Sequence, residues 1–321
     1  MNQKVYEILK ERILKMLEES KETGKLIWIK PWKTTCPLAK PYFSDQREYY
    51  QGINLVINEP GEYMTYKMIS EMHEKDSGVK LRKGAKQHTV FYYNFMDRKD
   101  EEGKVVLDEN GEPQKIPFLK FYKVYNIDDV EKVNSRIPYE HNEHTIDEDM
   151  EKADKYIKKY CELNGIDLQI KEGGQRAYYR PSANSITIPD KSQYKSIREY
   201  YSTCFHELSH AVDNKLKLIG DEKEEKDSEY ASGELLAEIS ANILCNIFHI
   251  EDDMSENNNL AYINGWYEHI KDRDGSYIAR VATKATKAAM HFVDSVELEL
   301  LKEEAINTDH VETVVLLSQN T

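Results

Sequence analysis

Apolar residues recur with helical spacing in several stretches of the chain. Residues 4–19 carry one apolar stripe, formed by Val5, Ile8, Leu9, Ile13, Leu14 and Leu17, which predicts an amphipathic helix. Further helices are predicted over residues 66–74, 148–164, 204–214, 230–248, 260–272 and 276–301.

Aromatic and β-branched runs predict strands between some of these helices. Residues 78–95 indicate a strand, a basic turn around Gly84 and a second strand, and residues 118–125 alternate as a further strand. The segment 97–115 between them has an Asn110-Gly111 turn signal and is expected to be an exposed hairpin or loop. Later, residues 173–190 predict two short strands around a turn at 181–184.

The order of these elements predicts an α+β protein of two domains, which the length of 321 residues supports. Residues 1–128 form the first, a small α+β domain. Residues 129–147 are acidic and form the connection, with His141 and His144 expected in solvent. Residues 148–321 form the second domain, which is mainly helical with a short sheet.

Charge is unevenly distributed. Residues 1–130 hold 22 Lys and Arg against 21 Asp and Glu, a net charge of +1, whereas the remainder carries −15. An anionic partner such as nucleic acid is therefore expected on the first half only.

The chain contains no run of 18 apolar residues, and it begins with a charged amphipathic stretch rather than a signal-peptide pattern. We therefore expect a cytoplasmic protein with no membrane partner. The four cysteines are widely spaced without a CxxC motif, so we predict reduced thiols rather than disulfides or a thiolate zinc cluster.

Residues 204–214 read CFHELSHAVDN and contain an HExxH motif. Side chains four apart share a helix face, so His206 and His210 can direct ring nitrogens at one zinc ion while Glu207 acts on a water molecule. A catalytic zinc site needs a third protein ligand and an open position. The pattern predicts a zinc-dependent peptidase in which Glu207 is the general acid and base.

The predicted helix over residues 230–248 offers the third ligand. Glu234 and Glu238 lie four apart on one face, so one can bind zinc while the other supports a ligand histidine. We favour Glu234 as ligand and Glu238 as support, although their order stays open.

The predicted strands over residues 173–190 matter for catalysis. Tyr178 or Tyr179 is a candidate donor to the developing oxyanion. An exposed strand edge there could pair with an extended peptide substrate, although residues 186–189 would look the same in a core strand.

The first half interleaves aromatic and basic residues, as single-stranded nucleic acid grooves do. The candidates are Trp28, Lys30, Trp32, Lys33, Arg47, Tyr49, Tyr50, Lys80, Arg82, Lys83 and Lys86. Taken alone, this pattern favours an ordinary α+β domain whose rings are core and whose lysines are solvated.

The motifs together resemble a known family. The segments YEILKERILKMLEES, WIKPW, YYQGINLVI, VKLRKGAK and FLKFYKVYNIDDVE are similar to the single-stranded-DNA-binding domain of ArdC-type antirestriction proteins. The segments RAYYRPSANSITIP, CFHELSHAVDN, YASGELLAEISANIL and AYINGWYEHIKD resemble the zincin-like metallopeptidase domain of that family.

The resemblance implies that His206, His210 and Glu234 bind Zn²⁺, that Glu207 is catalytic and that the first domain binds single-stranded DNA. It also implies residence on a mobile element, where the protein shields incoming DNA from restriction, with an unknown protein or peptide as substrate. Two alternatives remain: a non-catalytic DNA-binding protein that protects by occupancy and has a structural zinc domain, and an effector protease whose first half recognises protein.

Overall fold

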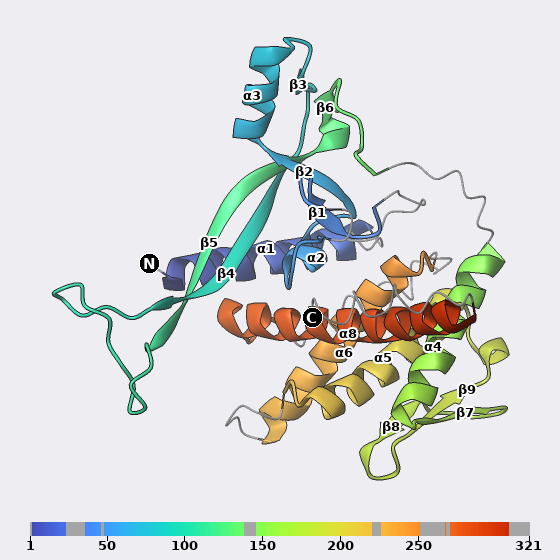
Figure 1. Cartoon of the computed structure of the whole chain (residues 1–321). Coiled ribbons are helices and arrows are strands. Elements are labelled where there is room, and N and C mark those ends of the chain that lie inside the picture. The colour runs from blue at the N-terminus through green and yellow to red at the C-terminus, as the bar shows by residue number, and fades with distance from the viewer. Residues whose placement is uncertain are drawn as a thin grey trace. The chain divides into compact units, whose positions relative to one another are not determined.

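The computed structural model describes residues 2–23, 36–45, 48–137, 146–219, 226–250, 267 and 270–307. The chain divides into two compact units (Figure 1). Unit 1 comprises residues 1–140 and 256–282, and unit 2 comprises residues 141–255 and 283–321. The predicted α+β class is confirmed, with a sheet-based first unit and a mainly helical second one.

Unit 1 is built on a four-stranded sheet in the order β1-β2-β5-β4. Its strands are β1 (Ala39–Pro41), β2 (Gly61–Thr65), β4 (Gln87–Asp97) and β5 (Lys115–Asn126). Helix α1 (Asn2–Thr23) lies against β5 and buries Leu9, Ile13 and Leu17 of its predicted stripe. The apolar residues that recur with the 3.6-residue period thus form the face of α1 that packs on the sheet.

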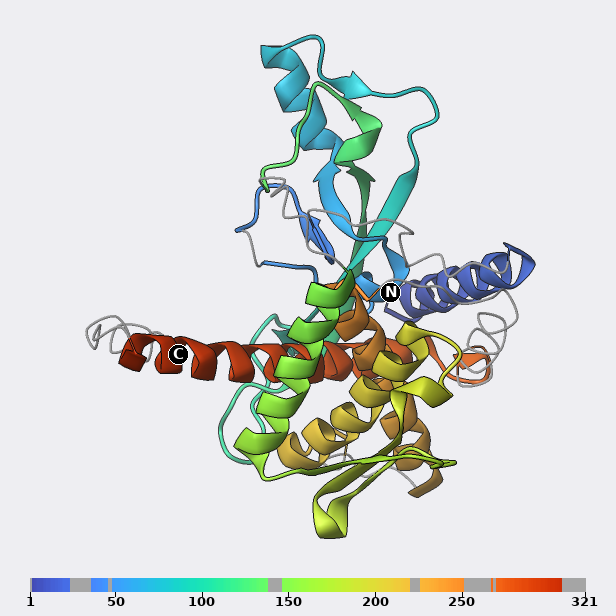
Figure 2. The same ribbon diagram turned by 90° about the vertical axis from the view of Figure 1, so that its right-hand side faces the viewer.

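A small lobe of unit 1 contains α3 (Tyr66–Lys75), β3 (Lys80–Leu81) and β6 (Val130–Glu131), as Figures 1 and 2 show. The Thr65 side chain accepts a hydrogen bond from the Met68 amide and caps α3. The core of the lobe consists of Tyr42, Met64, Ile69, Val79, Ile127 and Val130.

The two strands predicted on either side of the basic turn are β3 and β4, and β3 pairs with β6. One expectation is corrected in this lobe. Residues 130–137, assigned to the connection from their sequence, pack on unit 1: Val130 is buried, and the Asn134 carbonyl accepts a hydrogen bond from the Tyr42 hydroxyl. The β3–β6 pairing joins residues about fifty positions apart, which a local pattern does not reveal.

The outer edge of β4 is covered near its start. Asn54, the first residue of helix α2 (Asn54–Ile57), donates to the carbonyl of Phe91 and accepts from its amide, each at 2.7 Å. The Asn58 amide donates to the Thr89 carbonyl. These side chains satisfy backbone groups that an edge strand would otherwise expose.

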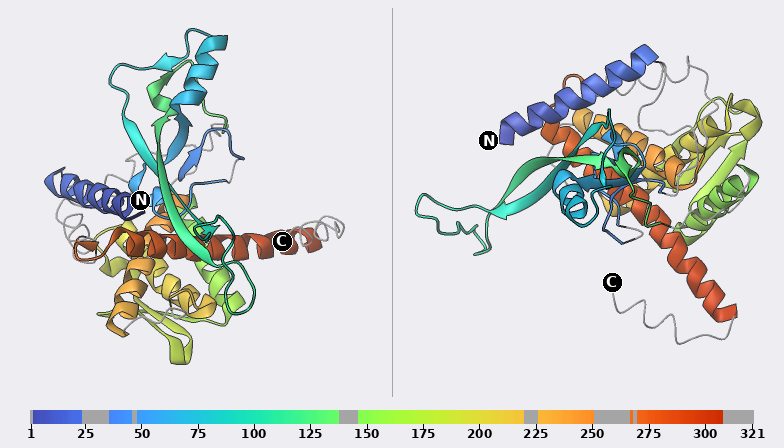
Figure 3. Two further views of the ribbon diagram at one scale, coloured as in Figure 1. Left: turned by 90° about the vertical axis from the view of Figure 1, so that its left-hand side faces the viewer. Right: turned by 90° about the horizontal axis from the view of Figure 1, so that it is seen from above.

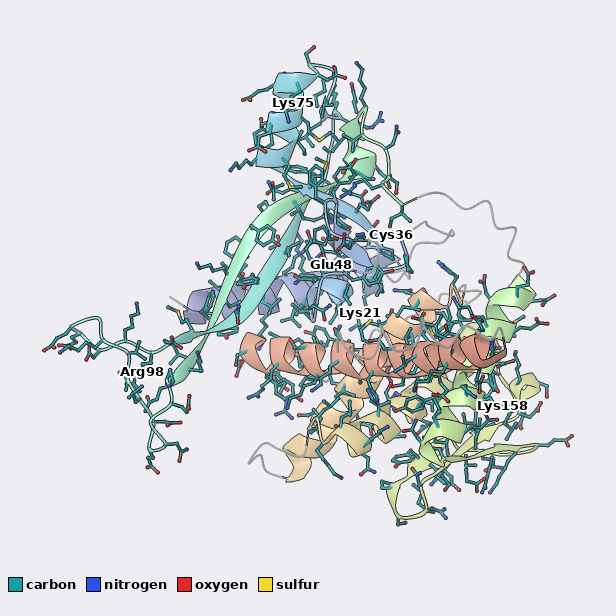
Figure 4. The ribbon with its side chains drawn as sticks, in the orientation of Figure 1. Lys21, Cys36, Glu48, Lys75, Arg98 and Lys158 are labelled. Carbon is teal, nitrogen blue, oxygen red and sulfur yellow. The ribbon has the colours of Figure 1, made fainter. Side chains whose placement is uncertain are left out.

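The predicted exposed loop between β4 and β5 consists of two consecutive turns of the same kind. Asp100 and Asp108 each accept two backbone amide hydrogen bonds, and Gly103 and Gly111 each have φ of +83°. The loop projects from the sheet (Figure 3), and Arg98 in Figure 4 marks its start.

Unit 2 is mainly helical, with a small sheet. Its helices are α4 (Ile146–Asn164), α5 (Ile197–Leu216), α6 (Lys226–Ile247) and the part of α8 (Gly275–Asn307) that follows residue 282. The small sheet contacts α4 and α5. Rings of Phe205, Phe248 and Phe292 pack together in the core. The predicted helix over residues 260–272 and the histidines at 141 and 144 lie largely or wholly outside the described residues.

The sheet of unit 2 has the order β7-β9-β8. The two predicted strands are β8 (Tyr178–Arg180) and β9 (Ser185–Pro189), which pair antiparallel around residues 181–183. Strand β7 (Asp167–Lys171), which pairs parallel with β9, was not predicted. Strand β8 therefore lies at the sheet edge, and it contacts α5.

Among the described residues, no helix is both long enough and apolar enough to cross a membrane.

Candidate metal centre and nucleic-acid interface

The HExxH motif lies in the middle of α5. The Ser196 side chain caps the helix by accepting from the Glu199 amide, and Lys217 ends it with a left-handed φ of 53°. On the inner side, Phe205 and Leu208 are buried in the core. Because the core holds that face, the ring nitrogens of the motif are directed to the opposite side of α5.

Three side chains converge beside α5. The Nε2 atoms of His206 and His210 are 3.1 Å apart. One Glu234 oxygen lies 3.4 Å from Nε2 of His206, and the other lies 3.6 Å from Nε2 of His210. Tetrahedral zinc with bonds of about 2.0–2.1 Å separates its ligand atoms by roughly 3.3 Å, so this set fits a zinc ion.

Glu238 lies on the other side of the His206 ring. Its Oε1 is 3.5 Å from His206 Nδ1, while Nε2 faces Glu234. A carboxylate in that place fixes the tautomer and the orientation of a metal-bound imidazole. The two carboxylates of α6 thus contact different nitrogens of one ring.

The electrostatics of the two histidines differ. Burial and the neighbouring His206 lower the pKa of His210 to about 4, so its ring is neutral with a free lone pair near pH 7. For His206, burial lowers the pKa, but the hydrogen bond to Glu234 and the charges of Glu238 and Glu207 outweigh it and raise the pKa overall.

Glu207 is only 8% exposed. Burial raises the pKa of its carboxyl group, although His206 and a hydrogen bond from the Tyr179 backbone amide oppose this. A raised pKa brings a carboxylate closer to the range in which a general base works best. Glu207 lines the same cavity of about 600 Å³ as His206, His210 and Glu234.

Tyr178 and Tyr179 also line this cavity. The Tyr179 hydroxyl donates to the Asn184 side chain at 3.2 Å and accepts from that of Asn214 at 3.1 Å. The Tyr178 hydroxyl hydrogen-bonds Thr187, which lowers its pKa. Tyr179 is therefore engaged in holding β8 to α5. The Tyr178 hydroxyl also accepts a hydrogen bond from Arg180 at 3.4 Å, so both hydroxyls have partners, and we keep Tyr178 as the candidate donor.

The nucleic-acid candidates fall into three groups. Trp28, Lys30, Trp32, Lys33 and Arg47 lie outside the described residues. Tyr49 is partly buried. Tyr50 is 8% exposed and its hydroxyl hydrogen-bonds Tyr122, so its proposed role as a base-stacking ring is corrected: it packs beneath the sheet surface.

The third group is basic and exposed. Lys80, Arg82, Lys83 and Lys86 lie at the turn that leads from β3 to β4. Lys80 pairs with Glu131 at 3.5 Å, and the Arg82 side chain donates to the Asp128 carbonyl. The Glu131 carboxylate thus offsets the charge of one residue of this basic cluster.

A further aromatic surface was missed. On one face of the β4–β5 ribbon, Tyr92, Phe118 and Tyr122 are exposed or half-buried beside Lys120. The rings of Tyr92 and Phe118 are 5.9 Å apart, and the Lys120 ammonium lies 5.4 Å from the Phe118 ring centre. Alternation along each strand was visible in the sequence, but the register that brings these residues together was not.

Two family models match the chain. Residues 152–284 match the zincin-like metallopeptidases, and residues 3–125 match the N-terminal domain of the anti-restriction factor ArdC. The chain is thus a two-domain protein with a zincin-like metallopeptidase domain, and this class implies the zinc ion that the three convergent side chains fit.

Two solved structures of one protein are similar to this chain over most of its length. The metal-free crystal structure of the antirestriction protein ArdC from plasmid R388 is 28% identical, with a TM-score of 0.61, and the match covers 91% of this chain and 97% of that one. The Mn(II)-bound structure of the same protein is 26% identical with a TM-score of 0.58. The chain thus combines an ArdC-type N-terminal domain with a zincin-like metallopeptidase domain, and its fold is similar to that of the R388 ArdC protein over most of its length.

Curated relatives include longer proteins. Two Escherichia coli sequences named DNA primase TraC are each 30% identical over 311 and 298 residues, and the chain spans 28% and 19% of their lengths. An uncharacterized Sinorhizobium fredii protein, y4eC, is 24% identical over 290 residues, covering 87% of this chain and 89% of that protein.

Proposed function

We propose that unit 2 is a zinc-dependent peptidase, that unit 1 binds single-stranded DNA, and that the protein protects DNA of a mobile element from restriction. One observation carries the catalytic part: two imidazoles and a carboxylate converge within 4.8 Å, and Glu207 lines the same cavity. The antirestriction role is carried over from the ArdC protein of plasmid R388.

Each residue of the centre has one role. His206, His210 and Glu234 hold the metal, and Glu238 orients His206 through Nδ1. A bound zinc ion would supply Lewis acidity toward a peptide carbonyl and toward water.

Glu207 handles the proton. Its carboxylate accepts a proton from the attacking water and delivers it to the leaving amine nitrogen. The Tyr179 amide keeps this carboxylate in place, and the Tyr178 hydroxyl donates to the oxyanion. Strand β8 lies at the sheet edge and its residues line the cavity, so an extended peptide would run beside β8 across the cavity.

Substitution of Glu207 tests the peptidase. Glu207→Gln keeps the shape of the side chain and removes the base, so the variant is expected to bind zinc like the parent and to lose at least about 100-fold in peptide cleavage. Elemental analysis and cleavage of a peptide mixture measure the two properties. His206→Ala is the control that loses the metal; full cleavage by Glu207→Gln would contradict the proposal.

The exposed aromatic face of β4–β5 supports the second candidate function, DNA protection by occupancy. Rings beside a lysine are what a single strand needs for stacking and charge neutralisation. If Glu207→Gln protects incoming DNA from restriction as well as the parent does, protection is by occupancy. If protection falls with cleavage, the peptidase is required.

A further inference from the structure

A second cavity, of about 360 Å³, adjoins the metal centre, and the two cavities share Ala177. Thr203, which lines the second cavity, precedes Glu207 by one turn of α5. We propose that this cavity is a substrate subsite for an acidic side chain and that Arg176 selects it. The proposal rests on the peptidase function and adds the class of residue recognised.

The walls of the cavity are preformed. Gln193 joins them: its side-chain oxygen accepts from the Gly173 amide at 2.9 Å, and its amide group donates to the Gly174 carbonyl at 2.9 Å. On the helix side, the Thr203 hydroxyl donates to the Glu199 carbonyl at 2.8 Å. A subsite whose walls are already hydrogen-bonded requires little ordering when a side chain enters.

The charge of this segment is opposite to that of its surroundings. Arg176 is exposed and has no ion pair among the described residues. Residues 171–180 contain three basic residues, Lys171, Arg176 and Arg180, and one acidic residue, Glu172. Their net charge is positive, whereas residues 131–321 as a whole carry a net charge of −15. A guanidinium matches a carboxylate through two parallel hydrogen bonds, so an unpaired arginine in a cavity favours Asp or Glu over Lys.

The position of the cavity fits an extended substrate. Arg176 precedes Tyr179, whose amide holds Glu207, by three residues. Arg176 lies two residues before the start of β8, so a peptide that runs beside β8 and past its start would reach the second cavity. The acidic side chain is therefore expected within a few residues of the bond that is cleaved.

Binding tests the subsite without turnover. The probes are fluorescent alanine-rich octapeptides that carry Glu, Gln or Lys at one position at a time, and the protein is the full-length zinc-loaded Glu207→Gln variant, measured by anisotropy. One position is expected to favour Glu over Lys by about tenfold. Arg176→Glu should reverse this preference, and Arg176→Lys should retain part of it.

Lys158→Glu is the matched control, because Lys158 is an exposed cation of α4, labelled in Figure 4, that lines neither cavity. It should leave the preference unchanged.

The outcomes separate the two proposals. Peptide binding with no acidic preference, or with a preference that Arg176→Glu leaves intact, overturns the subsite while the peptidase stands. If no probe binds and the parent cleaves no peptide, the peptidase is overturned, and the subsite with it.

Discussion

Glu234 and Glu238 show at the scale of single residues how two equivalent side chains acquire different roles. They lie one turn apart on α6, and both face His206. Only Glu234 reaches the Nε2 atoms of both histidines, whereas Glu238 reaches Nδ1. The two side chains are chemically identical, and either carboxylate could bind a metal. The difference in their contacts is therefore set by how α6 packs against α5.

This geometry predicts unequal losses of zinc affinity. Glu238→Ala removes only the support of one ligand and is expected to weaken zinc binding about 10- to 100-fold. Glu234→Ala removes a ligand and should weaken it more. Competition with a chromophoric chelator measures both dissociation constants, and the reverse order would show that Glu238 is the ligand.

At the scale of secondary-structure elements, the close contact between helices α1 and α8 requires a glycine. Helix α8 begins at Gly275, where an added Cβ would overlap the backbone carbonyl of Tyr6 in α1. Both residues belong to unit 1. In α6, by contrast, a Cβ added at Gly233 meets no atom within 4 Å.

Two glycine substitutions test this contact. Gly275→Ala forces α1 and α8 apart and is expected to destabilise the protein by about 1–3 kcal/mol. Gly233→Ala is the control: it removes a glycine from a helix interior and should stabilise by up to about 1 kcal/mol. Urea unfolding followed by circular dichroism reports both. An unchanged midpoint for Gly275→Ala would mean that α1 is not held at this position.

At the scale of the whole molecule, the candidate DNA-binding surface and the candidate metal site lie in different units. The exposed rings of the β4–β5 ribbon belong to unit 1, and the proposed metal ligands belong to unit 2. Residues 141–255 and 283–321, which make up unit 2, hold 17 Lys and Arg against 31 Asp and Glu, a net charge of −14. A DNA strand is therefore expected to bind unit 1 only.

Salt and ring substitutions test the DNA surface in the full chain. Affinity for oligo-dT should fall steeply with salt. Replacing both Tyr92 and Phe118 by alanine should weaken it at least about tenfold, because each stacked base contributes about 1–3 kcal/mol. Zinc content should not change. Fluorescence anisotropy measures binding, and Tyr66→Ala, which removes an exposed ring on α3, is the control. An equal loss from both would place the DNA site elsewhere.

Local periodicity in the sequence determined most helices and the pair of strands around residues 181–184. It also determined that His206 and His210 share a face of α5, because residues four apart on a helix always do. The ArdC-type resemblance came from the same local segments. These features depend on neighbours within a few residues, so no tertiary information was needed.

The tertiary structure alone decided the features that depend on distant partners. It paired β3 with β6, added β7 parallel to β9 and drew residues 130–137 into unit 1. It buried Tyr50 and left Tyr92 exposed at 48%, although both are tyrosines beside apolar residues. It also placed the Glu234 carboxylate beside Nε2 of both histidines and the Glu238 carboxylate beside Nδ1 of His206. Each outcome depends on strand register or helix rotation, which long-range packing sets and which a single sequence does not encode in any local pattern.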